Sequence, residues 1–90
     1  MCNCAGWIVR SAAGHDAGLL FCVVGAEEDG RLLLANGKQR KLSAPKRKKH
    51  SHIVVEDRGS FVHPAIQKLQ HRELVTDREL RRALAAFKGR

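Results

Sequence analysis

The chain has few aromatic residues and no long apolar run. Its 90 residues include three phenylalanines, one tryptophan and no tyrosine. No stretch approaches the roughly 18 consecutive apolar residues that a transmembrane helix needs. No basic segment followed by an apolar one opens the chain as a secretory leader would. The sequence therefore predicts neither a membrane span nor a secretory signal, and we expect a cytoplasmic protein.

Motifs typical of enzymes are also missing. The chain has no phosphate-cradling P-loop and no His-Glu-x-x-His pair. Ser11, His15 and Asp16 are the residue types of a hydrolytic triad, but neighbours in one short loop rarely reach the geometry of nucleophile, base and orienting acid. We interpret Asp16 as a residue that forms hydrogen bonds within its loop, and we expect no enzymatic activity and no cofactor.

Cysteine is scarce, and its count is odd. Cys2, Cys4 and Cys22 are the three cysteines of the chain. Without a secretory signal, they favour reduced thiols and no disulfide framework. A zinc site built from the three with a histidine is an alternative. Structural zinc usually uses paired Cys-x-x-Cys ligands, however, and a second pair is missing, so we expect no bound metal.

Positive charge is abundant and unevenly distributed. Seventeen Lys and Arg residues against nine acidic ones give a net charge of +8 and a sequence pI near 10.1. No acidic residue occurs from Lys38 to Val55, and seven of the thirteen residues from Lys38 to His50 are Lys or Arg. This balance favours a polyanionic partner, nucleic acid first and an anionic membrane surface second. A solvated loop that only aids solubility is the alternative.

Apolar runs separated by glycine-containing turns predict short β-strands. Expected strands cover residues 7–11, 19–24, 31–35, 38–42 and 52–56. The nearly continuous apolar run 19–24 indicates a buried strand, with Phe21 and Val23 in the core. Asn36-Gly37 is the dipeptide best suited to a two-residue hairpin, so 38–42 is expected to return as a charged edge strand.

The last third of the chain has helical spacing. Pro64 suits the first turn of a helix, and Thr76 to Glu79 form a capping-box pattern. Leu80, Leu84 and Phe87 then fall on one helical stripe. We expect this stripe to pack on the strands or on the preceding helix; a partner-binding surface is the alternative.

These signals predict a mainly β protein. We expect a flexible N-terminus over residues 1–6, a small five-stranded barrel over residues 7–58, and a C-terminal extension of two short α-helices over residues 59–90. A single domain of this size is able to fold alone. We expect it to be a monomer.

The order of the motifs resembles the KOW motif carried on an SH3-like barrel. The resemblance lies in Val9-Arg10-Ser11, Gly14-His15-Asp16-Ala17-Gly18, Phe21-Cys22-Val23-Val24, Asn36-Gly37-Lys38 and Pro45-Lys46-Arg47-Lys48-Lys49. The chain is similar over about residues 7–56 to small bacterial KOW-domain RNA-binding proteins, relatives of archaeal and eukaryotic large-subunit ribosomal proteins. The resemblance implies an SH3-like barrel and binding to RNA, ribosomal RNA in particular. His15 departs from the pattern, because similar proteins often carry a basic residue there.

The candidate RNA-binding residues are mostly basic. They are Arg10, Lys38, Arg40, Lys41, Lys46, Arg47, Lys48 and Lys49, with His50 and His52 as auxiliary donors and Gly14, Asp16 and Gly18 in the motif loop. Arginine binds phosphate in a bidentate manner that lysine cannot match. The basic segment contains no aromatic residue on which bases could stack. We therefore expect contacts to the backbone and shape of folded RNA, on the ribosome or elsewhere.

Other functions fit the same sequence. SH3-like barrels also serve as protein-interaction modules in transcription or translation complexes, and a basic surface also suits nonspecific binding of duplex DNA. The run from Pro45 to Lys49 in addition resembles a nuclear-import signal, a short basic pattern that occurs often by chance.

Overall fold

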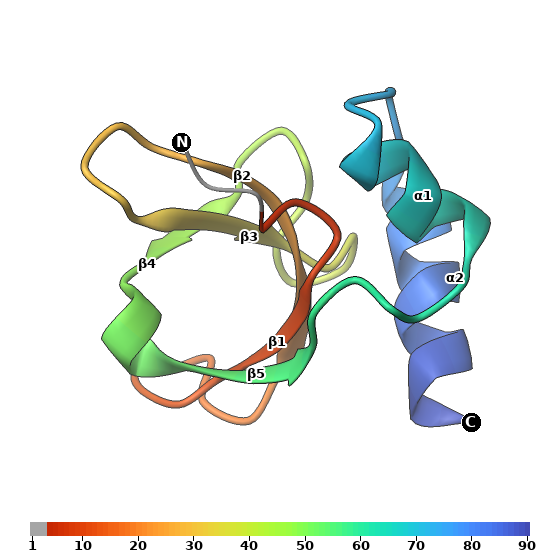
Figure 1. Cartoon of the computed structure of the whole chain (residues 1–90). Coiled ribbons are helices and arrows are strands. Elements are labelled where there is room, and N and C mark those ends of the chain that lie inside the picture. Colours follow the sequence, from red (N-terminus) through yellow and green to blue (C-terminus); the bar gives the residue numbers. More distant parts are fainter. Residues whose placement is uncertain (1–3) are drawn as a thin grey trace.

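A single antiparallel sheet dominates the computed structural model, which describes residues 4–90 (Figure 1). Within this range the strands are β1 (Ile8–Ser11), β2 (Leu20–Ala26), β3 (Leu32–Ala35), β4 (Lys46–Lys48) and β5 (Ile53–Asp57). Their spatial order is β4-β3-β2-β1-β5. The sheet curls, and a 3-10 turn, η1 (His50–His52), connects its two edge strands (Figure 1). The expected mainly β chain with five strands is confirmed.

Two helices follow the strands, as expected, and lie beside each other on one side of the sheet (Figure 1). They are α1 (Pro64–Gln70) and α2 (Asp77–Lys88). The helix α1 begins at Pro64, as predicted. At the start of α2, the Thr76 side chain accepts a hydrogen bond from the Glu79 backbone while the Glu79 side chain accepts one from the Thr76 backbone. This confirms the predicted capping box. Neither helix of residues 4–90 is long and apolar enough to cross a membrane.

Both faces of the central strands are covered, which explains the continuous apolar run in β2. Away from the helices, the buried core consists of Cys4, Val9, Phe21, Val23, Leu32 and Leu34. The other face packs against the helices through Ile8, Leu20, Cys22 and Ala35. A sheet with one wet face would alternate apolar and polar residues, whereas two covered faces require apolar residues at every position.

The expected strand over residues 38–42 does not form, and this prediction is wrong. The fourth strand is β4, which pairs Leu32 with Lys48 and Leu34 with Lys46. Asn36 accounts for the difference. Its Oδ1 accepts hydrogen bonds from the backbone N–H groups of Lys38 and Arg40, both at 3.0 Å, and closes a compact turn in place of a hairpin. The other four strands lie within two residues of their predicted bounds.

The N-terminal segment and the cysteines also differ from expectation. Residues 4–6 pack on the sheet: the Gly6 N–H donates to the Val23 carbonyl at 2.9 Å. Cys22 is a free, buried thiol, and burial raises its pKa to about 12. Cys4 is disulfide-bonded, so the expectation of reduced thiols alone is wrong at this residue; the count and spacing gave no sign of it. Cys2 lies outside the described residues.

The apolar stripe of α2 is buried, which confirms the packing expected for Leu80, Leu84 and Phe87. Replacing Leu80 by Ala should lower the free energy of unfolding by about 2 to 5 kcal/mol, because the side chain is fully buried between helix and sheet. Leu74→Ala is the matched control. Leu74 is 95% exposed, and its loss should change stability by less than about 0.5 kcal/mol. Equal effects in denaturant titrations would contradict this packing.

Candidate nucleic-acid interface

The basic segment extends from the loop after β3 to the end of β4, and most of its cations are available. Lys38, Lys41 and Lys49 are exposed, and Arg40 and Lys46 are half-buried. None of these five side chains forms a hydrogen bond or ion pair with another residue of the described chain. They form a set of cations without internal counter-charges, here called the free basic set.

Arg47 has a carboxylate partner. Its Nε lies 2.9 Å from Glu27 Oε2, on the turn between β2 and β3. The Arg47 side chain is still 63% exposed. A guanidinium carries five donors, so Arg47 keeps N–H groups that point to solvent.

Lys48 belongs to the interior. Its side chain is 8% exposed, and its Nζ donates to the Ala13 carbonyl at 2.7 Å and to Asp16 Oδ1 at 2.8 Å. The sequence groups Lys48 with three phosphate-binding candidates. Alternation along β4 instead turns it inward, opposite Leu32 of the core.

The motif loop between β1 and β2 is held by charged residues on both sides. Gly14 and Gly18 adopt positive φ values of 84° and 89°, which glycine takes without strain. Arg10 Nη1 donates to the Gly18 carbonyl at 2.7 Å, and Ser11 Oγ donates to Asp16 Oδ1 at 2.8 Å. Asp16 thus bonds within its own loop, as we interpreted it. Arg10 also lies 3.8 Å from Glu56, so this candidate cation has a structural role.

The environment of Asp16 favours its charged form. Burial alone would raise the pKa of this carboxyl group. The hydrogen bonds from Lys48 and Ser11, together with the charge of Lys48, outweigh burial and hold the pKa below the ordinary value of 3.8. The pair is therefore an ion pair at neutral pH, largely shielded from water.

The two candidate histidines lie close to the motif loop. His50 and His52 are exposed in η1, and the His52 carbonyl accepts a hydrogen bond from the Ala12 N–H at 2.9 Å. Figure 1 shows η1 and the motif loop at the same end of the sheet. The structure therefore brings together the two histidines, Lys49 and the glycine loop.

The loop over residues 36–42 leaves the sheet and docks on the start of α2. Arg81 Nη1 donates to the Gly37 carbonyl at 2.6 Å, and the Leu42 N–H donates to Asp77 Oδ1 at 2.8 Å. Gly37 has a φ of 76°, and a Cβ there would collide with the Asp77 backbone. This approach places Lys38, Arg40 and Lys41 beside the first turns of α2. No local pattern in the sequence predicts this contact, since the partners are more than 30 residues apart.

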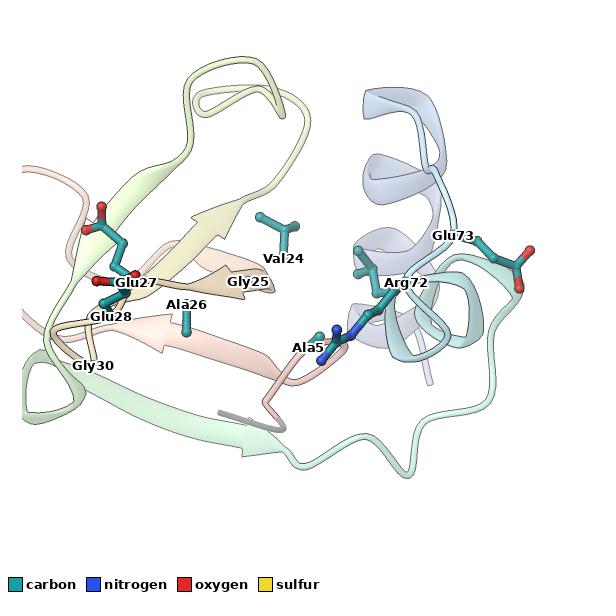
Figure 2. Close-up of a pocket in the computed structure, with 10 residues that line it drawn as sticks. Ala5, Val24, Gly25, Ala26, Glu27, Glu28, Gly30, Arg72 and Glu73 are labelled. Carbon is teal, nitrogen blue, oxygen red and sulfur yellow. The ribbon is translucent and has the colours of Figure 1, made fainter. Parts of the chain in front are cut away.

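A pocket of about 750 Å³ lies elsewhere, between the turn after β2 and the end of α1. Figure 2 shows Glu27 and Glu28 on one side of it and Arg72 and Glu73 on the other. Three carboxylates in the lining disfavour the binding of a phosphate in this pocket. Within residues 4–90, no group of three or more His, Cys, Asp or Glu side chains is arranged to hold a metal ion.

Comparison with known proteins assigns no family. No protein-family model matches the sequence, and no curated protein is similar to it at a significant level. The function therefore has to be inferred from the chemistry of the surface.

Because the pKa of Asp16 is lowered in the folded chain, the contribution of this residue to stability depends on pH. Replacing Asp16 by Asn should lower the free energy of unfolding at pH 7 by about 2 to 4 kcal/mol, because Lys48 then stays buried without a counter-charge. Because the pKa is lower in the folded chain, this contribution is present above about pH 4 and is lost as the pH falls through the folded-state value. In urea titrations from pH 7 down to pH 2, the difference in the free energy of unfolding between wild type and Asp16→Asn should become smaller as the pH falls.

Glu28→Gln provides the control for this pH series. Glu28 is exposed and has no side-chain partner in the described chain, so this variant should follow wild type throughout. A gap between Asp16→Asn and wild type that stays constant down to pH 2 would contradict the ion pair.

Proposed function

We propose that this chain is an RNA-binding protein that contacts the phosphate backbone of structured RNA. The observation that carries the proposal is the free basic set: five cations within residues 38–49, all without an internal counter-charge. In a protein that only needed solubility, such cations would be interspersed with acidic residues. A dense surface of one sign instead fits a polyanion, and each cation that binds a phosphate releases condensed counterions.

The positions of the aromatic residues favour contacts to the RNA backbone over the reading of bases. Phe21 and Phe87 are buried, and Trp7 and Phe61 are half-buried. No aromatic residue lies in the basic segment. Proteins that bind single strands commonly stack bases on exposed aromatic rings. Recognition through the shape and phosphates of folded RNA fits this surface better.

The same proposal includes the SH3-like barrel and the KOW motif. Three features support it: the curl of the five-stranded sheet (Figure 1), the glycine loop between β1 and β2, and the basic edge strand β4. The resemblance to KOW-domain proteins points to ribosomal RNA as the structured RNA. The proposal accordingly places a monomeric protein on ribosomes in the cytoplasm.

Burial of the α2 stripe weakens the protein-interaction alternative. That alternative relied on Leu80, Leu84 and Phe87 as a contact surface, and all three are buried against the chain's own sheet and helix α1. Nonspecific binding of duplex DNA has the same electrostatic basis as RNA binding, so it is distinguished by titrating a DNA hairpin at matched salt.

The test removes three exposed members of the free basic set. Lys38→Gln/Lys41→Gln/Lys49→Gln should weaken binding to a folded RNA hairpin and reduce the slope of log K against log salt by about 2, at about 0.7 to 0.9 per lost contact. Lys48 stays unchanged because it neutralises Asp16. The charge-matched control is Arg31→Gln/Arg58→Gln/Lys88→Gln, which leaves the basic segment intact. The proposal would be overturned if both variants weakened RNA binding equally, or if neither variant weakened it.

Two further measurements identify the class of ligand. A DNA hairpin of the same sequence, titrated at matched salt, should bind more weakly than the RNA hairpin; equal affinity would favour the DNA alternative.

Ribosomes from the protein's own cells should retain the chain on the large subunit through a high-salt wash. Loss at modest salt would point to another structured RNA, and absence from ribosomes at low salt would overturn the ribosomal assignment.

A further inference from the structure

The outward face of α2 is basic. Helical periodicity places Leu80, Ala83, Leu84 and Phe87 inward. The opposite side of the helix presents Arg78, Arg81 and Arg82, followed by the small residues Ala85 and Ala86, all exposed. The three arginines lie in the first half of the helix. They are here called the α2 arginines.

Both acidic residues of α2 are engaged elsewhere. Asp77 accepts the hydrogen bond from the Leu42 N–H. Glu79 closes the capping box and lies 2.7 Å from the Lys68 ammonium on α1. That contact, with the backbone hydrogen bond from Thr76, lowers the pKa of Glu79, which therefore stays charged and bound to them. Within the described residues, neither carboxylate is paired with an α2 arginine, so the outward charge is not balanced within the helix.

This arrangement of charge is unfavourable for the helix itself. The N-terminal end of a helix carries a partial positive charge, so Arg78 is unfavourably placed in the first turn, although Asp77 and Glu79 of the same turn are favourably placed. Arg78 and Arg82 are also four residues apart on the helix, where like charges repel each other. A helix selected for stability alone would carry these cations in its last turn, where Lys88 lies.

Docking of the 36–42 loop adds to the repulsion. Gly37 contacts Arg81, and Leu42 contacts Asp77. The loop cations Lys38, Arg40 and Lys41 lie between these two anchors. Close packing, two hydrogen bonds and the positive φ of Gly37 hold two segments of the same sign together. Departures from favourable local electrostatics that are held in place by specific contacts are typical of functional sites.

We propose that the α2 arginines form a second RNA-binding surface, adjacent to the loop cations, on which backbone phosphates of the same RNA bind. The inference rests on the proposed function and extends the interface from the sheet edge to the helix. Guanidinium groups suit this role because they form bidentate bonds to phosphate oxygens. Ala85 and Ala86 have small side chains, so that a sugar–phosphate backbone can approach the helix closely beside the arginines.

The first experiment neutralises two of the arginines. Arg78→Gln/Arg82→Gln should weaken binding to the folded RNA hairpin about tenfold at moderate salt, as expected for two surface ionic contacts, and should lower the salt slope by about 1.5, at about 0.7 to 0.9 per lost contact. Arg81 is retained because it anchors Gly37. Arg31→Gln/Arg58→Gln removes the same charge from other parts of the chain and should bind much as wild type does. Unchanged affinity of the α2 variant, or an equal loss in the control, would overturn the inference.

The second experiment keeps every charge and disturbs only the docking. Gly37→Ala introduces a Cβ that collides with the Asp77 backbone, so the loop must move away from α2. Gly30→Ala is the matched control: Gly30 has a similar positive φ of 91° but no atom within 4 Å of the added Cβ. Gly37→Ala should weaken RNA binding several-fold more than Gly30→Ala does, with both folds checked by circular dichroism. Equal affinities would show that the juxtaposition has no role.

Failure of this inference can be told apart from failure of the proposed function. If wild type does not bind the RNA hairpin, the proposed function fails and the inference fails with it. If wild type binds and the triple lysine variant is weakened while Arg78→Gln/Arg82→Gln is not, only the inference fails. If the α2 variant alone is weakened, the helix is the main interface and the assignment to the free basic set is overturned.

Discussion

The ion pair between Lys48 and Asp16 ties the edge of the sheet to a loop on its far side. The strand β4 has only three residues and pairs with β3 alone. The Lys48 side chain nevertheless reaches the loop between β1 and β2, three strands away in the sheet order. A contact across this span requires the sheet to curl. The curl in turn encloses the core around Phe21 and Leu34 and leaves the opposite face to the helices.

The same pair changes how the basic segment should be understood. Seven cations occur between Lys38 and Lys49, but they are not equivalent once the chain has folded. Lys48 is paired with the half-buried carboxylate of Asp16, and Arg47 is paired with Glu27. The remaining five have no counter-charge within residues 4–90. The number of uncompensated cations, and not the net charge of +8, is therefore the quantity that bears on binding.

Local signals in the sequence predicted most elements, and long-range contacts account for the rest. Pro64, the capping box at Thr76 and the apolar run of β2 act over a few residues, so they can be recognised in the sequence. The strand β4 has the sequence Lys-Arg-Lys, which has little intrinsic preference for a strand, and it is stabilised by pairing with β3 and by the Lys48 contact. Docking of Gly37 on α2 likewise depends on a backbone approach between distant segments. The candidate lysines of the loop could be recognised from local composition. The α2 arginines become candidates only because the fold places the 36–42 loop and its cations beside them.

Coverage of the sheet by the last third of the chain has a consequence for synthesis. The pairs β1–β2 and β2–β3 join neighbouring strands and can form as soon as those residues are made. The pairing of Val9 with Val55 and the burial of Leu20 and Cys22 under α2 must wait for segments made much later. A nascent chain halted before Asp77 would therefore present an apolar sheet face to its surroundings. Completion of α2 is the step that closes this face, so a chain truncated before this helix should be incompletely folded and prone to aggregation, and not a shorter functional domain.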